Sequence, residues 1–263
     1  MAFRIGRGGV EIVALRDGDH TPDWIWHFPK DGGDCEGCLN FGAFLVIADG
    51  KTVLVDTGWG PHHEPPGGLT APAGLLADMA SAGVGPDDVD LVVFTHLHPD
   101  HVGWNLILDP PVRPRFPRAR YLVPREDWLH YNVRDDIHPG IVEQALPLER
   151  LGVLQLIDDG HRVTSSIRAI AAPGHTPGHT VYAAGDDTLL LGDLAHHPDV
   201  LERTRWHQRF DWNPEEAVAT REKLLDQAER EGTLVGLGHF PPPSLGHVIR
   251  KDGRRIWHPL ETR

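Results

Sequence analysis

The chain has 263 residues, enough to bury one sizeable core, and an α/β domain of this length need not divide in two. Its formal net charge of −13 at pH 7 disfavours nucleic acid as a partner, because phosphate binding needs Lys and Arg to displace counterions. No apolar run reaches bilayer length, and residues 1–9 lack the apolar region of a secretory signal. We therefore expect one domain over residues 1–263, located in the cytoplasm, that acts on a small molecule without nucleic-acid or membrane partners.

The first half of the chain alternates strand and helix patterns. A hairpin is predicted around Asp49-Gly50, a strong turn pair between two apolar runs. The proline-rich stretch 110–117 precludes regular structure. Strands are expected at Val10–Leu15, Phe41–Ala48, Thr52–Val55, Leu91–Phe94 and Arg120–Val123, and helices at Leu69–Ala82 and Arg125–Asn132.

The second half continues with short strands and one long helix. Asn213-Pro214-Glu215-Glu216 is a strong helix start, with an N-cap, a proline at the first position and acids in the first turn, and the helix should run to about Glu231. Strands are expected at Val153–Ile157, Ile167–Ala171, Val181–Ala184, Thr188–Leu191 and from Leu234 towards His239. The pattern as a whole predicts a layered α/β sandwich.

The segment from Thr95 to His101 contains the first candidate metal ligands. It places three histidines and an aspartate just after the apolar strand Leu91–Phe94. Imidazole is the commonest protein ligand for divalent transition metals, and His96 and His98 leave one turn on the same side, so they can share one ion. Asp100 and His101 must point elsewhere and suit a second ion beside the first.

Further candidate ligands follow in loops downstream. His175 lies in a tight Gly- and Pro-rich loop after a strand-like run. Asp193 ends the apolar run Thr188–Leu191 in a Gly-Asp pair, at the carboxyl edge of a sheet, where it could bridge two ions. His239 ends the apolar run that starts at Leu234. His179, the second histidine of the Gly-His-Thr-Pro-Gly-His loop, is expected to be a structural hydrogen-bonding residue.

With these residues in order, the chain resembles the metallo-β-lactamase fold superfamily over nearly its whole length. The resemblance implies a four-layer αββα sandwich in a single domain. It implies that His96, His98 and His175 hold one metal, that Asp100, His101 and His239 hold a second, and that Asp193 bridges the two. It also makes Asp56, in Leu54-Val55-Asp56-Thr57-Gly58, a residue that orients a ligating imidazole through the ring nitrogen facing away from the metal.

Within the superfamily the chain is most similar to the soluble lactonases and to the methyl parathion hydrolase group. The loop at 174–179 is typical of the lactonases, whereas the tail from Gly238-His239 to Trp257-His258-Pro259 resembles the parathion hydrolase group. Lactonases that open acyl-homoserine lactones carry a Tyr three residues after the bridging Asp. Here that position is His196, which is compatible with the parathion hydrolase group.

We expect the two divalent ions to be zinc, with iron, manganese or cobalt left open. A pair of such ions indicates hydrolysis, because a water that bridges them ionises near neutral pH. Asp100, besides ligating, is placed to take part in proton transfer. His196 is predicted to donate a hydrogen bond to the substrate oxygen or to accept the proton of the leaving group. A homodimer is expected from the resemblance alone.

Three functions stay open at this point. The first is a binuclear hydrolase of lactones or carboxylic esters in hydrophobic substrates. The second is an organophosphate triester or aryl ester hydrolase of the methyl parathion hydrolase type, which His196 and the tail favour. The third is a mononuclear iron dioxygenase or a non-catalytic metal-binding protein, which the complete second set of ligands disfavours.

Two other features have weaker implications. Cys35 and Cys38 form a Cys-x-x-Cys, but no second pair completes a structural zinc site, so a loop near the site entrance is favoured over a zinc or redox role. Aromatic residues gather mostly at loop positions, with Trp128 and Tyr131 on the predicted helix Arg125–Asn132, and they either line an apolar pocket or serve packing or a dimer interface. These residues are Trp24, Trp26, Phe28, Trp59, Trp104, Trp128 and Tyr131.

Overall fold

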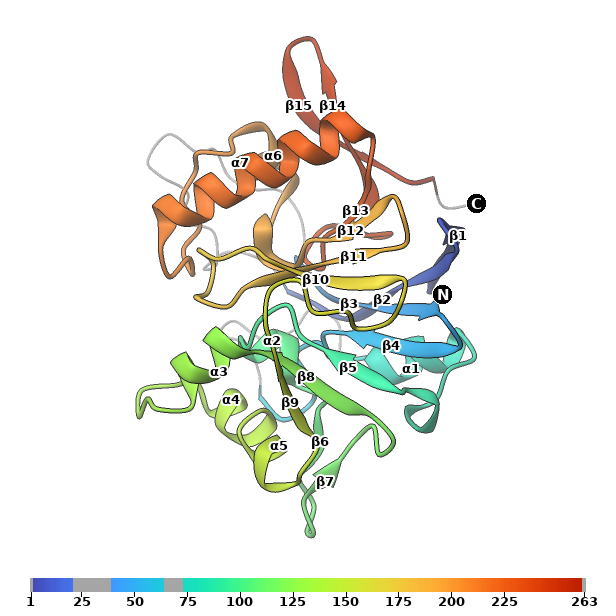
Figure 1. Cartoon of the computed structure of the whole chain (residues 1–263), viewed down its shortest axis with the longest axis vertical. Coiled ribbons are helices and arrows are strands. Elements are labelled where there is room, and N and C mark those ends of the chain that lie inside the picture. The colour runs from blue at the N-terminus through green and yellow to red at the C-terminus, as the bar shows by residue number, and fades with distance from the viewer. Residues whose placement is uncertain (1, 21–38, 64–72, 262–263) are drawn as a thin grey trace.

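Two β-sheets lie face to face with helices on both outer sides, so the chain forms four layers (Figure 1). The computed structural model describes residues 2–20, 39–63 and 73–261. In the described residues the first sheet has seven strands in the order β1-β2-β3-β4-β5-β8-β9, and the second has six in the order β10-β11-β12-β13-β14-β15. This architecture confirms the predicted four-layer α/β sandwich.

The first sheet is antiparallel at its start and parallel from β4 onward. The predicted hairpin connects β3 to β4 through Asp49 and Gly50, whose φ angles of 54° and 69° fit a tight hairpin turn. Strand β1 was not predicted. The strands are β1 Phe3–Arg7, β2 Val10–His20, β3 Leu39–Ala48, β4 Lys51–Val55, β5 Leu91–Val93, β8 Arg120–Pro124 and β9 Leu154–Ile157.

The second sheet is antiparallel except for the central pair β12 and β13. Its strands are β10 Ile167–Ala171, β11 Thr180–Ala184, β12 Thr188–Leu190, β13 Leu234–Gly236, β14 Leu245–Lys251 and β15 Arg254–Pro259. The hairpin β14–β15 was not predicted as strands. The expectation of no regular structure at 110–117 was wrong in one detail, because β7 Arg113–Pro114 pairs with β6 Leu106–Ile107.

The long helix α7, Pro214–Glu231, confirms the predicted start and end: Asn213 Oδ1 accepts a hydrogen bond from the Glu216 N–H at 3.3 Å, and Gly232 ends the helix at φ 64°.

Helix α1 begins at Leu75 rather than at residue 69, with Gly74 as its N-cap; residues 69–72 lie outside the described part. Helices α4, α5 and α6 were missed because segments this short show no clear periodicity. The remaining elements are α1 Leu75–Ser81, α2 Pro99–Val102, α3 Arg125–Tyr131, α4 Pro139–Gln144, α5 Pro147–Arg150, α6 Pro198–Glu202, and the 3₁₀ turns η1 Pro86–Asp88 and η2 Gly192–Leu194.

Three buried apolar clusters fill the spaces between the four layers. The central one packs the facing sides of the two sheets, with Val46 and Val53 from the first and Leu190 and Leu234 from the second. The outer two lie beneath helices α1, α3 and α4 on one side and beneath α7 on the other. No helix in the described residues combines the length and the apolar character needed to cross a membrane.

The layering brings several strand ends to one edge of the sandwich. Strands β4 and β5 are parallel, and so are β12 and β13. Strand β10 runs in the same direction as β12, because both are antiparallel to β11. The segments that follow the carboxyl ends of these strands, including α2 and η2, contain all the residues predicted to form the site.

Candidate metal centre

Seven side chains converge where these loops meet. They form two sets that share Asp193, and within each set the potential ligand atoms all lie within 4.8 Å of one another. The first set is His96, His98, His175 and Asp193, and the second is Asp100, His101, Asp193 and His239. The structure therefore brings together all seven side chains predicted as ligands, in the two groups that were predicted.

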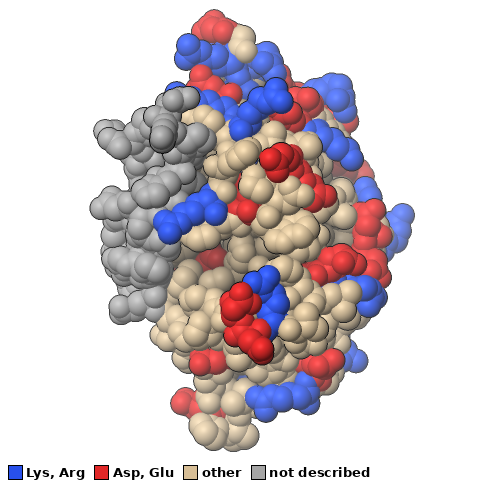
Figure 2. Space-filling view, turned by 90° about the vertical axis from the view of Figure 1, so that its left-hand side faces the viewer, with Lys and Arg blue, Asp and Glu red and all other residues tan. Residues whose placement is uncertain are grey.

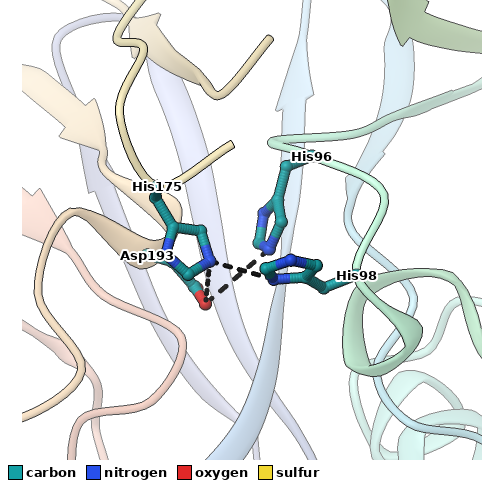
Figure 3. Close-up of side chains that lie close together, drawn as sticks. All are labelled: His96, His98, His175 and Asp193. Carbon is teal, nitrogen blue, oxygen red and sulfur yellow. Dashed lines mark hydrogen bonds and ion pairs between the residues drawn. The ribbon is translucent and has the colours of Figure 1, made fainter. Parts of the chain in front are cut away.

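The first set faces a common point between the two sheets (Figure 3). His175 Nε2 lies 3.0 Å from His98 Nδ1 and 3.3 Å from Asp193 Oδ2. His96 Nε2 lies 3.7 Å from the same carboxylate oxygen. The contacts within this set therefore involve Nδ1 of His98 but Nε2 of His96 and His175.

The second set also meets at the Asp193 carboxylate. His101 Nε2 is 3.2 Å from Asp193 Oδ1 and 3.7 Å from Asp100 Oδ2. His239 Nε2 is 3.1 Å from Asp193 Oδ2 and 3.4 Å from Asp100 Oδ2. The Asp193 carboxylate therefore touches both sets, as a bridging ligand must.

The unsatisfied atoms of the site match the requirements of metal ions. His96 Nε2, His101 Nε2 and Asp193 Oδ1 are buried without a hydrogen-bond partner, although buried polar atoms are normally paired. Burial, aided by the neighbouring imidazoles, holds the pKa of His96 well below its ordinary value, so its ring is neutral. Burial favours protonation of Asp193, but the surrounding imidazoles outweigh it and hold the pKa of this carboxyl well below its ordinary value. Burial disfavours protonation of His101, but Asp193 and Asp56 outweigh it and raise the pKa of this imidazole well above its ordinary value, and a cation bound there would displace that proton. Imidazoles around an ionised carboxylate are a donor set that fits divalent cations.

The ring nitrogens that face away from the two sets are held by neighbouring groups. His101 Nδ1 lies 2.8 Å from Asp56 Oδ2, as predicted for Asp56. Asp56 also accepts hydrogen bonds from the Thr95 N–H and hydroxyl, each at 2.8 Å, and its φ of 61° places it in the left-handed region. His239 Nδ1 donates to the Asn40 carbonyl at 2.9 Å. These contacts fix the ring orientations before any ion binds.

His179 has the structural role predicted for it. Its Nδ1 donates to the Ala172 carbonyl at 3.0 Å, and its Nε2 accepts from the Asp193 N–H at 3.1 Å. The ring therefore orients the backbone of the shared aspartate.

Two buried aspartates in the site were missed by the sequence analysis. Asp127 of α3 accepts from the Leu97 N–H at 2.9 Å and from the Gly178 N–H at 2.6 Å, and thereby ties the loop of His96 to that of His175. Asp211 Oδ1 lies 3.0 Å from His175 Nδ1. Neither residue has a motif around it, because each reaches the site from a distant part of the chain.

A cavity of about 460 Å³ opens onto both sets. Its wall includes Phe41, Trp59, Tyr131, Phe210 and Trp212, together with the charged Arg134 and Asp136. Figure 2 shows uncharged residues at the hollow with red and blue side chains above and below it. Trp59 and Tyr131 thus line a pocket, as one of the two interpretations predicted, whereas Trp128 packs into the core and Trp104 donates a hydrogen bond to Asp17. Cys35, Cys38, Trp24, Trp26 and Phe28 lie outside the described residues.

His196 lines this cavity and is buried. Its Nε2 lies 3.0 Å from Asp193 Oδ2, and its backbone N–H donates to Gln208 Oε1 at 2.7 Å. His130 and His138 line the same cavity, although no ligand spacing marks them in the sequence.

The comparison with protein families agrees with the site. The family described as the Metallo-beta-lactamase superfamily matches residues 43–239, which include every predicted ligand. The chain belongs to the metallo-β-lactamase superfamily. The resemblance drawn from the motifs is therefore confirmed at the level of family and fold.

Among the relatives of this chain, some names state an activity and others state only the domain. N-acyl homoserine lactonase AttM of Azorhizobium caulinodans is 29% identical over 187 residues, 64% of this chain and 64% of that protein. Metallo-beta-lactamase domain-containing protein 1 of Rattus norvegicus is 33% identical over 200 residues, 74% of this chain and 68% of that protein. The match to the lactonase thus spans less than two thirds of its length.

Solved structures of this fold superpose over the whole chain. AidC, described as a dizinc quorum-quenching lactonase, has a TM-score of 0.85 at 22% identity and covers 100% of this chain and 98% of its own. The hydrolase AbOPH of the beta lactamase superfamily has a TM-score of 0.84 at 24% identity with the same coverage. At these identities the superpositions establish the fold.

Proposed function

We propose that this protein is a binuclear metal-dependent hydrolase that cleaves lactone or carboxylic ester bonds in hydrophobic substrates. The observation that carries the proposal is the pair of ligand sets sharing Asp193 at one end of an aromatic-lined cavity. The lactonase relative from Azorhizobium caulinodans supports the substrate class. Zinc is the proposed metal at both sets, and a cytoplasmic location and a homodimer complete the proposal.

Each group at the site has a task in this reaction. Two ions held by these sets would supply an ionised water and polarise the bond to be cleaved. Asp193 holds the two sets at a fixed separation. Asp100 is the most exposed carboxylate of the sets, with 15% of its side chain accessible, so it can exchange a proton with the leaving oxygen. His196 Nε2 lies beside Asp193 in the cavity, within reach of a substrate oxygen.

A second substrate class is an organophosphate triester or an aryl ester. Two observations favour it: His196 occupies the position where acyl-homoserine lactonases have Tyr, and the cavity wall carries Trp59, Phe41 and Trp212, which suit an aromatic leaving group. A mononuclear dioxygenase is less favoured, because the ligands of the second set are all in place.

Turnover by the zinc-loaded protein against four substrate classes separates these functions. The classes are acyl-homoserine lactones, simple lactones, nitrophenyl carboxylic esters and methyl parathion. The controls are metal-stripped protein and His239→Ala, which removes one ligand of the second set. Turnover dominated by lactones or alkyl esters and lost in both controls supports the proposal. Preference for methyl parathion or aryl esters assigns the second class, and no turnover in any class contradicts a hydrolase.

A further inference from the structure

Helix α7 carries a completely buried arginine beside the first ligand set. Arg221 has no exposed surface, and its guanidinium makes four contacts to the segment that follows Asp193. Nε donates to the Leu194 carbonyl at 2.6 Å, and Nη1 donates to the carbonyls of Thr204 and Trp206 at 2.7 and 2.9 Å. Nη2 lies 3.4 Å from Asp211 Oδ2.

Asp211 connects this arginine to His175. The carboxylate is fully buried, with Oδ2 towards Arg221 and Oδ1 3.0 Å from His175 Nδ1. Oδ2 also accepts from the Gln208 N–H at 3.1 Å. The three side chains form a chain of contacts from guanidinium through carboxylate to imidazole, and this chain ends with His175 Nε2 facing the first set.

The same segment is fixed to the site at three further points. The Trp212 N–H donates to the His175 carbonyl at 3.0 Å, and the Asn213 N–H donates to the Gly174 carbonyl at 2.9 Å. Gln208 Oε1 accepts from the His196 N–H. Residues 208–213 thus hold His175 by both its side chain and its backbone, and they also place the pocket residue Trp212.

A buried ion pair is a poor source of stability, because removing two charges from water costs as much as their attraction returns. Such a pair next to a ligand is better explained by orientation, since a carboxylate that accepts from one ring nitrogen fixes the tautomer and raises the basicity of the other. Asp56 makes the same contact to His101 in the second set. Each set therefore has one imidazole backed by a buried carboxylate.

We propose that Asp211 and Arg221 are positioning residues that hold His175 in the geometry for binding the metal ion of the first set. This inference rests on the metal-dependent function proposed above. Arg221 acts through Asp211, because its planar guanidinium holds the Asp211 carboxylate and the backbone carbonyls nearby. The ammonium group of a lysine cannot reproduce this geometry.

The test measures metal release from the zinc-loaded protein to an excess of chelator, without substrate. Loss of such a partner typically weakens metal binding by about 10–100-fold, so Asp211→Ala should release one of two ions faster by about that factor and leave the other at the wild-type rate. Asp56→Ala should likewise accelerate the release of one ion. In the double variant both ions should leave fast, because the two aspartates serve different sets.

Arg221→Lys should accelerate the release of the same ion as Asp211→Ala does. Arg230→Lys on the same helix is the matched control and should behave like the wild type, because Arg230 is exposed and pairs only with Glu231 in the described residues. Wild-type release of both ions from Asp211→Ala overturns the inference. So does equal acceleration of both ions together with a lowered unfolding temperature, which marks a merely structural role. A wild type that binds two ions but hydrolyses nothing overturns the proposed function and leaves this inference standing.

Discussion

Gly103 packs closely against the Trp59–Gly60 peptide, and among the described glycines a Cβ added at Gly103 would come nearest to another atom. A single methyl group therefore tests the importance of this contact. Gly103 follows α2, at φ −64° and ψ −22°, so alanine fits its backbone conformation. A Cβ there would lie 1.8 Å from the Trp59 carbonyl oxygen and 2.6 Å from the Gly60 nitrogen. Ordinary contact begins at 3.4 Å, so the two segments must separate by about 1.6 Å.

That separation breaks the hydrogen bond from the Gly103 N–H to the Gly58 carbonyl, now 2.8 Å long. Without the clash, Gly→Ala would stabilise the fold by about 0.4–1 kcal/mol through the unfolded chain. Overpacking typically costs about 1–3 kcal/mol and occasionally more. Because both partners here are backbone and cannot change rotamer, we expect Gly103→Ala to lower the free energy of unfolding by about 3 kcal/mol or more.

Urea unfolding monitored by tryptophan fluorescence measures this change. The control is Gly6→Ala, where a Cβ meets nothing within 4 Å and φ is not positive. The control should stay within about 0.5 kcal/mol of the wild type, as surface changes usually do. A Gly103→Ala protein as stable as the control would refute the close approach of these two loops.

Three further predictions concern other parts of the molecule. Tyr182→Phe should lower the free energy of unfolding by about 1–3 kcal/mol in urea titrations, because the Tyr182 hydroxyl donates at 2.7 Å to the buried Phe94 carbonyl of the other sheet. Burial raises the pKa of Asp17 to about 6 from 3.8, so its stabilising contribution is complete below the lower value and is lost as pH rises through the higher one. Stability measured from about pH 4 to about pH 7 should therefore fall by up to about 3 kcal/mol in the wild type relative to Asp17→Asn, which does not titrate; parallel curves would contradict this. His196→Phe should lower kcat by about 100-fold or more if the imidazole exchanges a proton in the reaction, and a change within about twofold removes it from that role.

The ligands could be predicted from the sequence because their positions are marked locally. His96, His98, Asp100 and His101 lie within one short segment, and His175, Asp193 and His239 each follow an apolar strand. The parallel ends of β4 and β5 and of β12 and β13 then bring these segments to one edge. Strand pattern and residue type marked these residues as candidate ligands, and the family resemblance supplied their division into two sets.

The supporting residues lay beyond such reasoning. Asp211 and Arg221 are separated from His175 by 36 and 46 positions, and nothing around either residue distinguishes it from a surface charge. Asp127 sits on a helix predicted correctly, but its burial depends on how α3 packs against two loops. Helices α4, α5 and α6 were missed because segments this short depend on tertiary contacts for stability and show no clear periodicity of their own.

Anomalous X-ray scattering from crystals of the zinc-loaded protein shows directly whether two metal ions bind at these residues. We expect two zinc peaks about 3.5–4 Å apart, one contacting His96, His98 and His175 and the other contacting Asp100, His101 and His239, with Asp193 between them. A single peak, or zinc bound away from these residues, would contradict it.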